Sequence, residues 1–212
     1  ILDANFEGYE NVHAMLSNNT PCYGNDNPEV DAIAKDIFQC FCNTVHDVNK
    51  QGIYGYACVS LFSFIGHITV GEVVGATPNG RLRGAPLSDA MGPSQGKDIS
   101  GPTRLLKSAI SLDNRTNVTG AYALNVKLNP ASVHGQKGLQ NLKAMIKAYL
   151  KNNGVQLQFN FIDTKTLEAA KKEPEKYQNL IVRVAGYCEY FNNLDANMQD
   201  EIISRTAHEL AG

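Results

Sequence analysis

Helical spacing of apolar residues is the main feature of the first fifty positions. Residues 2–17 are predicted to form a helix, because several apolar side chains fall near one face. Asn27 and Pro28 then make a good helix start, since proline is favoured in a first helical turn. The helix that follows is predicted to reach about residue 50 and to pack on one side. Its apolar positions are Val30, Ile33, Ile37, Phe41, Val45 and Val48.

After this helix the sequence changes to β-forming residues and then to a stretch rich in glycine and proline. Residues 56–71, YACVSLFSFIGHITVG, are rich in β-forming residues and predict one or two strands. Residues 75–86, GATPNGRLRGAP, contain five glycine and proline breakers and predict a loop. A helix is expected over residues 100–113, begun by Ser100 or its neighbours, with Pro102 in its first turn.

Strands and helices alternate through the second half of the chain. Strands are predicted at 121–129, at 154–163 and, as the last strand, at 179–185. Within 154–163 the apolar side chains alternate with Gln156, Gln158 and Asn160. An amphipathic helix is expected over 136–151, a short helix capped by Thr164 ends before Pro174, and Asp195 caps the last helix. This order is typical of an α/β fold with parallel strands and crossover helices.

Composition narrows the class of protein. The chain has 212 residues, 43% of them apolar and 19% charged, which indicates a globular protein. A formal charge of −2 argues against nucleic acid as a partner, and there is neither an apolar run long enough for a membrane span nor a signal-peptide pattern. The odd number of cysteines favours a reducing, cytoplasmic location. They are Cys22, Cys40, Cys42, Cys58 and Cys188.

The common catalytic motifs are missing from the sequence. There is no P-loop, no dinucleotide-binding glycine fingerprint, no nucleophile elbow and no H-x-x-x-H pair. Cys40 and Cys42 form a C-x-C pair without a matching second pair, so they are assigned to the long helix rather than to zinc. We therefore expect neither a metal nor a bound cofactor. By these motifs alone, the chain is an α/β domain of unknown purpose.

Three blocks of sequence change this picture. Residues 181–210, IVRVAGYCEYFNNLDANMQDEIISRTAHEL, contain Arg183-Val-Ala-Gly186-Tyr187 followed by the pattern Ile-Ile-x-Arg205-Thr. Residues 74–113 contain GATPNGR, APLSDAMGP and GPT, and residues 4–31 contain ANFEGYE and YGNDNPEVD. Together these blocks closely resemble the glycyl radical enzymes, a family that includes pyruvate formate-lyase and the B12-independent glycerol dehydratase. The resemblance covers essentially the whole chain.

The resemblance implies a role for Gly186 as the catalytic residue. In this family the corresponding glycine stores a backbone radical, which an amide nitrogen and a carbonyl group delocalise when the Cα is near-planar. A side chain would crowd that plane, whereas glycine tolerates unusual dihedral angles. The alternative is a glycine that ends a strand or forms a bulge. Arg183 is interpreted either as an anchor of this loop to a carboxylate or carbonyl group, or as a surface arginine.

The resemblance also implies that catalysis requires a cysteine outside this chain. None of the five cysteines lies in a matching sequence context. Cys188, two residues after Gly186, is interpreted as a core thiol next to a strand rather than as a radical relay. The fold implied is the C-terminal part of a ten-stranded β/α barrel, with the radical glycine on a loop near the C-terminus. Residues 1–90 would flank the barrel and residues 91–212 would form the glycine radical domain.

These points lead to a working hypothesis and three alternatives. The chain, which begins at Ile1 and reads as a piece of a longer polypeptide, would carry the radical of a lyase or dehydratase acting on a small molecule. A separate activating enzyme, with S-adenosylmethionine and an iron–sulfur cluster, would install the radical. Further partners would be an upstream polypeptide carrying the cysteine and a second copy in a homodimer. The alternatives are a formate C-acetyltransferase-type enzyme and a non-catalytic radical-domain subunit. A fold relative without a radical is the remaining interpretation.

Overall fold

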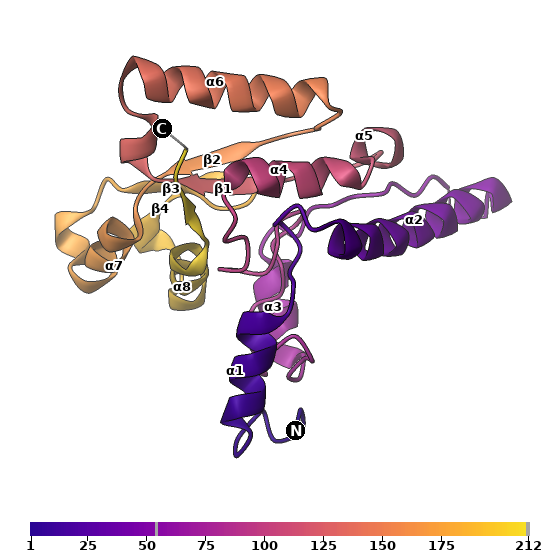
Figure 1. Ribbon diagram of the computed structural model, residues 1–212, viewed down its shortest axis with the longest axis horizontal. Coiled ribbons are helices and arrows are strands. Elements are labelled where there is room, and N and C mark those ends of the chain that lie inside the picture. The colour runs from indigo at the N-terminus through magenta and orange to yellow at the C-terminus, as the bar shows by residue number, and fades with distance from the viewer. Residues whose placement is uncertain (54, 211–212) are drawn as a thin grey trace.

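The computed structural model describes residues 1–53 and 55–210, and its centre is a short parallel sheet. The strands are β1 (Asn125–Leu128), β2 (Gln158–Phe161) and β5 (Ala207–His208), in the order β2-β1-β5. β1 is parallel to both neighbours. Figure 1 shows α6 (Gly135–Lys151) on one side of this sheet and α7 (Thr164–Lys172) and α8 (Ala196–Ser204) on the other. The predicted α/β class with parallel strands is therefore confirmed.

Two apolar cores lie on opposite sides of the sheet. The first joins Val126 and Leu128 of β1 to Met145 and Tyr149 of α6. It also contains side chains of α2 (Pro28–Gln51) and α4 (Pro102–Ser111). The second core lies among α3 (Gly66–Val73), α7, α8 and the segment that precedes α8. Because helices cover both faces, β1 is buried along nearly its whole length, as parallel strands require.

The long helix α2 begins and ends where the sequence predicts. The Asn27 side chain accepts hydrogen bonds from the amides of Glu29 and Val30, and so caps the helix. Phe38 and Cys42 face the first core. The neighbouring face carries Ile33, Ile37 and Phe41, which are 62%, 68% and 48% exposed. α2 thus packs on one side, but Ile33, Ile37 and Phe41, which were predicted to lie on the packed side, are exposed to solvent instead.

Two elements of the first half differ from their predictions. The first helix, α1, spans Glu10–Asn19 rather than residues 2–17, because turns with positive φ at Asn5, Phe6 and Gly8 precede it. The strands expected over 56–71 are wrong for most of that range. Leu61 makes an isolated bridge to Tyr122, and residues 66–73 form α3. Packing of Ile68 into the second core outweighs the β propensity of this stretch.

The segment before the last helix also differs. β3 (Ile181–Arg183) does not join the parallel sheet but forms an antiparallel hairpin with β4 (Cys188–Tyr190), so the strand expected at 179–185 is neither parallel nor last. Asp163, not Thr164, caps α7 by accepting from the amide of Thr166. Asp195 caps α8 as predicted, accepting from the Met198 amide at 3.0 Å. The remaining short elements are α5 (Asn114–Asn117), η1 (Pro130–Val133), η2 (Pro174–Lys176) and η3 (Phe191–Asn193).

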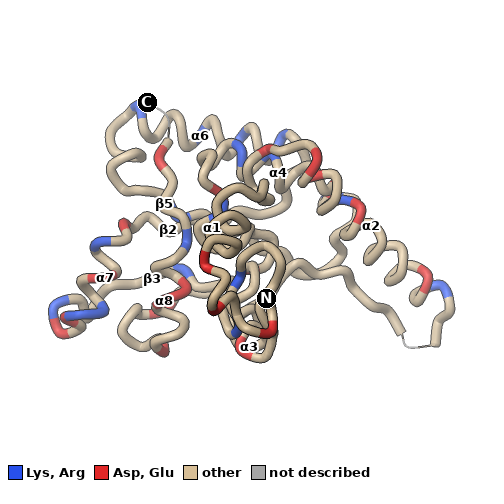
Figure 2. Tube along the Cα trace, turned by 60° about the horizontal axis from the view of Figure 1, so that its bottom comes forward, with Lys and Arg blue, Asp and Glu red and all other residues tan. Residues whose placement is uncertain are grey.

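Charged residues of both signs are spread over α2 and α7, whereas α6 carries lysines (Figure 2). No helix within residues 1–53 and 55–210 has the length and apolar content needed to cross a bilayer.

Candidate functional site

Gly186 occupies the turn of the β3–β4 hairpin. The amide of Val184 donates to the carbonyl oxygen of Tyr187 at 2.9 Å and closes this turn. Gly186 has a φ of +83°, a region that strains any residue with a side chain. A Cβ built on Gly186 would lie 2.7 Å from Cζ of Phe62, which is closer than van der Waals contact. The backbone conformation therefore favours glycine here, and a Cβ would in addition have to displace the Phe62 ring.

The polar face of β2 holds the first half of the hairpin. Oε1 of Gln158 accepts a hydrogen bond from the Gly186 amide at 3.1 Å and another from Nε of Arg183 at 2.6 Å. Asn160 forms a two-point contact with the Arg183 backbone, since Oδ1 accepts from its amide and Nδ2 donates to its carbonyl, both at 2.6 Å. These contacts connect the hairpin to the parallel sheet.

The polar face of β2 is its more deeply buried side. Gln158 and Asn160 are 6% and 7% exposed, whereas Phe161, on the alternate side, is 46% exposed. The alternation expected from the sequence is real, but its polar residues are the more deeply buried ones. They are tolerated in the interior because each is hydrogen-bonded to the hairpin.

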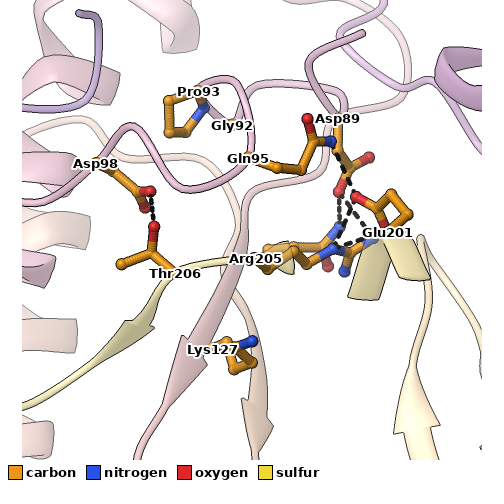
Figure 3. A pocket seen from close by; sticks show the side chains of 10 residues that line it. Asp89, Gly92, Pro93, Gln95, Asp98, Lys127, Glu201, Arg205 and Thr206 are labelled. Carbon is orange, nitrogen blue, oxygen red and sulfur yellow. Dashed lines mark hydrogen bonds and ion pairs between the residues drawn. The ribbon is translucent and has the colours of Figure 1, made fainter. Parts of the chain in front are cut away.

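Arg205, at the end of α8, binds the other side of the turn. Its Nη1 donates to the carbonyl oxygen of Val184 at 3.0 Å, and its Nη2 lies 2.8 Å from a carboxylate oxygen of Glu201 and 3.4 Å from one of Asp89. The three side chains converge in Figure 3. Burial disfavours ionisation of Glu201, but the nearby His67 and the Arg205 guanidinium outweigh it and lower its pKa to about 2. Glu201 is therefore a buried carboxylate paired with Arg205.

A small cavity of about 30 Å³ lies next to this ion pair. Lys127 of β1 lines it, and its Nζ donates to the carbonyl oxygen of Ile203 at 2.9 Å. Burial, together with the positive charge of Arg205, lowers the pKa of Lys127 to about 8. Asp98 lies across the cavity, where it accepts from the Thr206 hydroxyl and lies 2.7 Å from Nε2 of His208. This volume suits a water molecule rather than a substrate.

Aromatic side chains cover the turn. The rings of Phe64 and Tyr187 lie 5.2 Å apart between centroids, and those of Phe62 and Phe64 lie 6.3 Å apart. Phe62 and Phe64 come from the segment just before α3, more than one hundred residues away in sequence. The apolar surroundings expected for Gly186 are thus supplied in part by a distant segment, although the glycine itself is exposed in this chain.

The other residues singled out from the sequence are placed as follows. Arg183 binds a carbonyl oxygen, as one of its two interpretations required, and that oxygen belongs to the Gln158 side chain. The interpretation of Cys188 as a core thiol is wrong, because the residue is exposed on the two-stranded hairpin, with Sγ 3.4 Å from Nη1 of Arg183. Cys40 and Cys42 lie on α2 as predicted. No cluster of potential metal ligands occurs in the described part of the chain.

Sequence reasoning missed the roles of Gln158, Asn160 and Phe62. The first two carry a usable signal: polar side chains on one face of a strand expected in a parallel sheet must be buried, and so must be paired. Phe62 carries no such signal, because only the tertiary structure brings its segment to the hairpin.

The comparisons with known proteins agree with this arrangement. A family model described as glycine radical matches residues 87–192, and one described as pyruvate formate lyase-like matches residues 1–71. Trans-4-hydroxy-L-proline dehydratase of Clostridioides difficile is 43% identical over 97% of this chain and 26% of its own length. Isethionate sulfite-lyase of Desulfovibrio desulfuricans is 40% identical over 99% of this chain and 25% of its own length.

Solved structures show the same relationship. The glycerol-bound B12-independent glycerol dehydratase of Clostridium butyricum matches with a TM-score of 0.89 and 39% identity, over 98% of this chain and 26% of that chain. The chain thus spans about a quarter of the length of the relatives it matches. The family match, the relatives and the shared fold establish that this chain belongs to the glycyl radical enzymes.

Proposed function

We propose that this chain is the radical-bearing C-terminal portion of a dehydratase or lyase, and that Gly186 stores the radical. The observation that carries the proposal is the position of Gly186 in an Arg-Val-Ala-Gly-Tyr turn, where its positive φ and the nearby Phe62 ring both disfavour a side chain. The relatives named above are dehydratases and a sulfite-lyase, which favours this class over a formate C-acetyltransferase.

The proposed chemistry at Gly186 is removal of one hydrogen atom from Cα. The C–H bond breaks homolytically, and the hydrogen atom passes to a radical made from S-adenosylmethionine by one-electron reduction at the iron–sulfur cluster of an activating enzyme. One unpaired electron remains on Cα, shared with the adjacent amide nitrogen and carbonyl. The chain itself supplies the turn, the hydrogen bonds that hold it and the aromatic cover.

The rest of the catalytic cycle requires groups outside this chain. The Gly186 radical would take a hydrogen atom from a catalytic cysteine on an upstream polypeptide, and the resulting thiyl radical would react with a small-molecule substrate. We retain the division into residues 1–90, flanking the barrel, and 91–212, the radical domain, as part of this proposal. A homodimer of the complete enzyme, in an oxygen-poor cytoplasm, is the corresponding assembly.

Electron paramagnetic resonance tests this function. The polypeptide that carries this chain is incubated anaerobically with the activating enzyme, S-adenosylmethionine and a reductant. We expect a doublet from the wild type and from Gly135→Ala, and none from Gly186→Ala. Gly135 is the matched control, because it also has positive φ (+72°) but open space around the Cβ position. A doublet that persists in Gly186→Ala rules out Gly186 as the radical site.

A non-catalytic radical-domain subunit is the second candidate. Turnover assays test whether the catalytic cysteine lies outside this chain, as both candidates require. We expect the 212-residue chain to be inactive with the activating enzyme alone, and to support turnover only with the polypeptide that carries the cysteine. Turnover by the 212-residue chain alone would contradict a cysteine outside it and return attention to Cys58 and Cys188.

A further inference from the structure

We infer that Gln158 is the positioning residue of the radical glycine, because one oxygen of its side chain holds both the Gly186 amide and Arg183. The inference rests on the proposed function of Gly186 and extends it to a residue outside the glycine motif. It is based on three observations: Gln158 lies on a strand of the sheet, its side chain is buried, and two donors converge on its side-chain oxygen.

The backbone of Gln158 is held by the parallel sheet. It pairs with Asn125 in the parallel sheet, and its own amide donates to the carbonyl oxygen of Leu124 at 2.9 Å. Its side chain lies on the side of β2 that faces the hairpin, and the residue is only 6% exposed. A buried side chain on a sheet strand has little freedom to move, so its oxygen is a fixed reference point for the turn.

Both lone pairs of that oxygen have a donor. The Arg183 guanidinium donates at 2.6 Å, as expected of a charge-assisted bond, and the Gly186 amide donates at 3.1 Å. Asn160 fixes the Arg183 backbone on either side of its Cα. The arginine therefore cannot shift without breaking these contacts, and it helps to hold the Gln158 oxygen under the Gly186 amide.

The Gly186 amide matters for a chemical reason. A radical at Cα is stabilised by electron donation from the amide nitrogen, and this requires the amide plane to align with the flattened Cα. At a φ of +83° the plane of the Gly186 amide is nearly perpendicular to the plane that the N, C and H substituents of a flattened Cα would define. Loss of the hydrogen atom must therefore be accompanied by rotation about the N–Cα bond. The Gln158 oxygen accepts from the Gly186 N–H and so holds the plane of that peptide group in place. It thereby sets the orientation that the flattened Cα of the radical must adopt.

Three substitutions separate this role from general packing. Gln158→Met has a similar length but no acceptor oxygen, and Gln158→Glu keeps one. Gln156→Met is the control on the same strand region, because the Gln156 side chain accepts from the Leu124 amide and not from the hairpin. All variants are made in the polypeptide that carries this chain, and retention of the fold is checked by circular dichroism.

The first measurement needs no radical. Hydrogen–deuterium exchange of overlapping peptides reports the protection of the Gly186 amide. We expect Gln158→Met to exchange this amide about tenfold faster than wild type, since its hydrogen bond is lost, and Gln158→Glu and Gln156→Met to stay near wild type. Unchanged protection in Gln158→Met overturns the inference without affecting the proposed function.

The second measurement uses the activated protein with 15N-labelled glycine. We expect the nitrogen hyperfine coupling of the radical to change in Gln158→Met and to be restored in Gln158→Glu. A coupling equal to wild type in Gln158→Met shows that Gln158 serves only the packing of the hairpin and overturns its positioning role. Absence of any radical in the wild type refutes the proposed function instead, and the exchange result remains interpretable by itself.

A third measurement covers the case in which Gln158→Met does not fold. Electron–nuclear double resonance on the wild-type radical, in protein labelled with 13C in the glutamine side-chain carbonyl, detects the contact directly. A resolved 13C coupling supports the inference, and its absence overturns it.

Discussion

Arg205 donates to the carbonyl oxygen of Val184 at 3.0 Å and so ties the end of α8 to the turn that carries Gly186. The same guanidinium pairs with the buried Glu201 and lies near Asp89. The β3–β4 hairpin is therefore held from two directions, by Gln158 on the sheet and by Arg205 at the end of α8. The proposed activating enzyme would reach Gly186 only after both contacts break, so each contact would control release of the turn.

Replacement of Arg205 by Met is expected to destabilise the fold by about 3–5 kcal/mol, because it leaves the Glu201 carboxylate buried without its partner. Chemical denaturation measures the change in the free energy of unfolding. The double variant with Glu201→Gln should recover part of the loss, whereas Arg115→Met, at an exposed arginine, should have little effect. A loss in Arg205→Met no larger than in Arg115→Met would contradict the buried pair.

Glu201 also predicts how stability depends on pH. Its folded pKa of about 2 lies below the ordinary 4.5, so the unfolded state binds more protons between these values. The stabilisation is complete above about pH 4.5 and is lost as pH falls towards 2, by up to about 3 kcal/mol. Denaturation of wild type and Glu201→Gln across this range measures it. Parallel pH profiles for the two proteins would show that Glu201 is not the titrating group.

Gly186 and Phe62 are predicted to be coupled in stability. Gly186→Ala should cost about 1–2 kcal/mol from its positive φ, and more from contact with the Phe62 ring, while the fold persists. Phe62→Ala removes that contact, so Gly186→Ala should cost less in the Phe62→Ala background than in the wild type. A double-mutant cycle by thermal denaturation gives the interaction energy. A value near zero would mean that Phe62 does not cover Gly186 in solution.

Oxygen is predicted to cut the activated chain at Gly186. The unpaired electron on Cα reacts with O₂, and the backbone breaks there. Mass spectrometry after exposure to air should find a C-terminal piece starting next to Gly186 and a matching N-terminal piece. Protein that was never activated is the control and should stay whole. An intact chain after a confirmed radical signal would place the radical elsewhere.

Local sequence determined much of the fold. Asn27 and Pro28 begin α2, Asp195 caps α8, and the periodicity over 136–151 marks α6 almost to the residue. These features depend on neighbouring side chains and on the spacing of apolar residues, both of which are visible in the sequence. The blocks that identify the family are equally local, so family membership was also predictable.

Tertiary structure decided the rest, because the deciding contacts join residues far apart in the chain. The stretch at 66–73 has β propensity but forms α3, since packing against α8 favours a helix there. β3 pairs with β4 because the turn at Gly186 brings them together, and its contacts with β2 replace a place in the parallel sheet. The burial of Gln158 and the contact between Arg205 and Val184 follow from that arrangement. The sequence by itself determined which glycine to examine, whereas the side chains that hold and cover it were decided by long-range packing and hydrogen bonding.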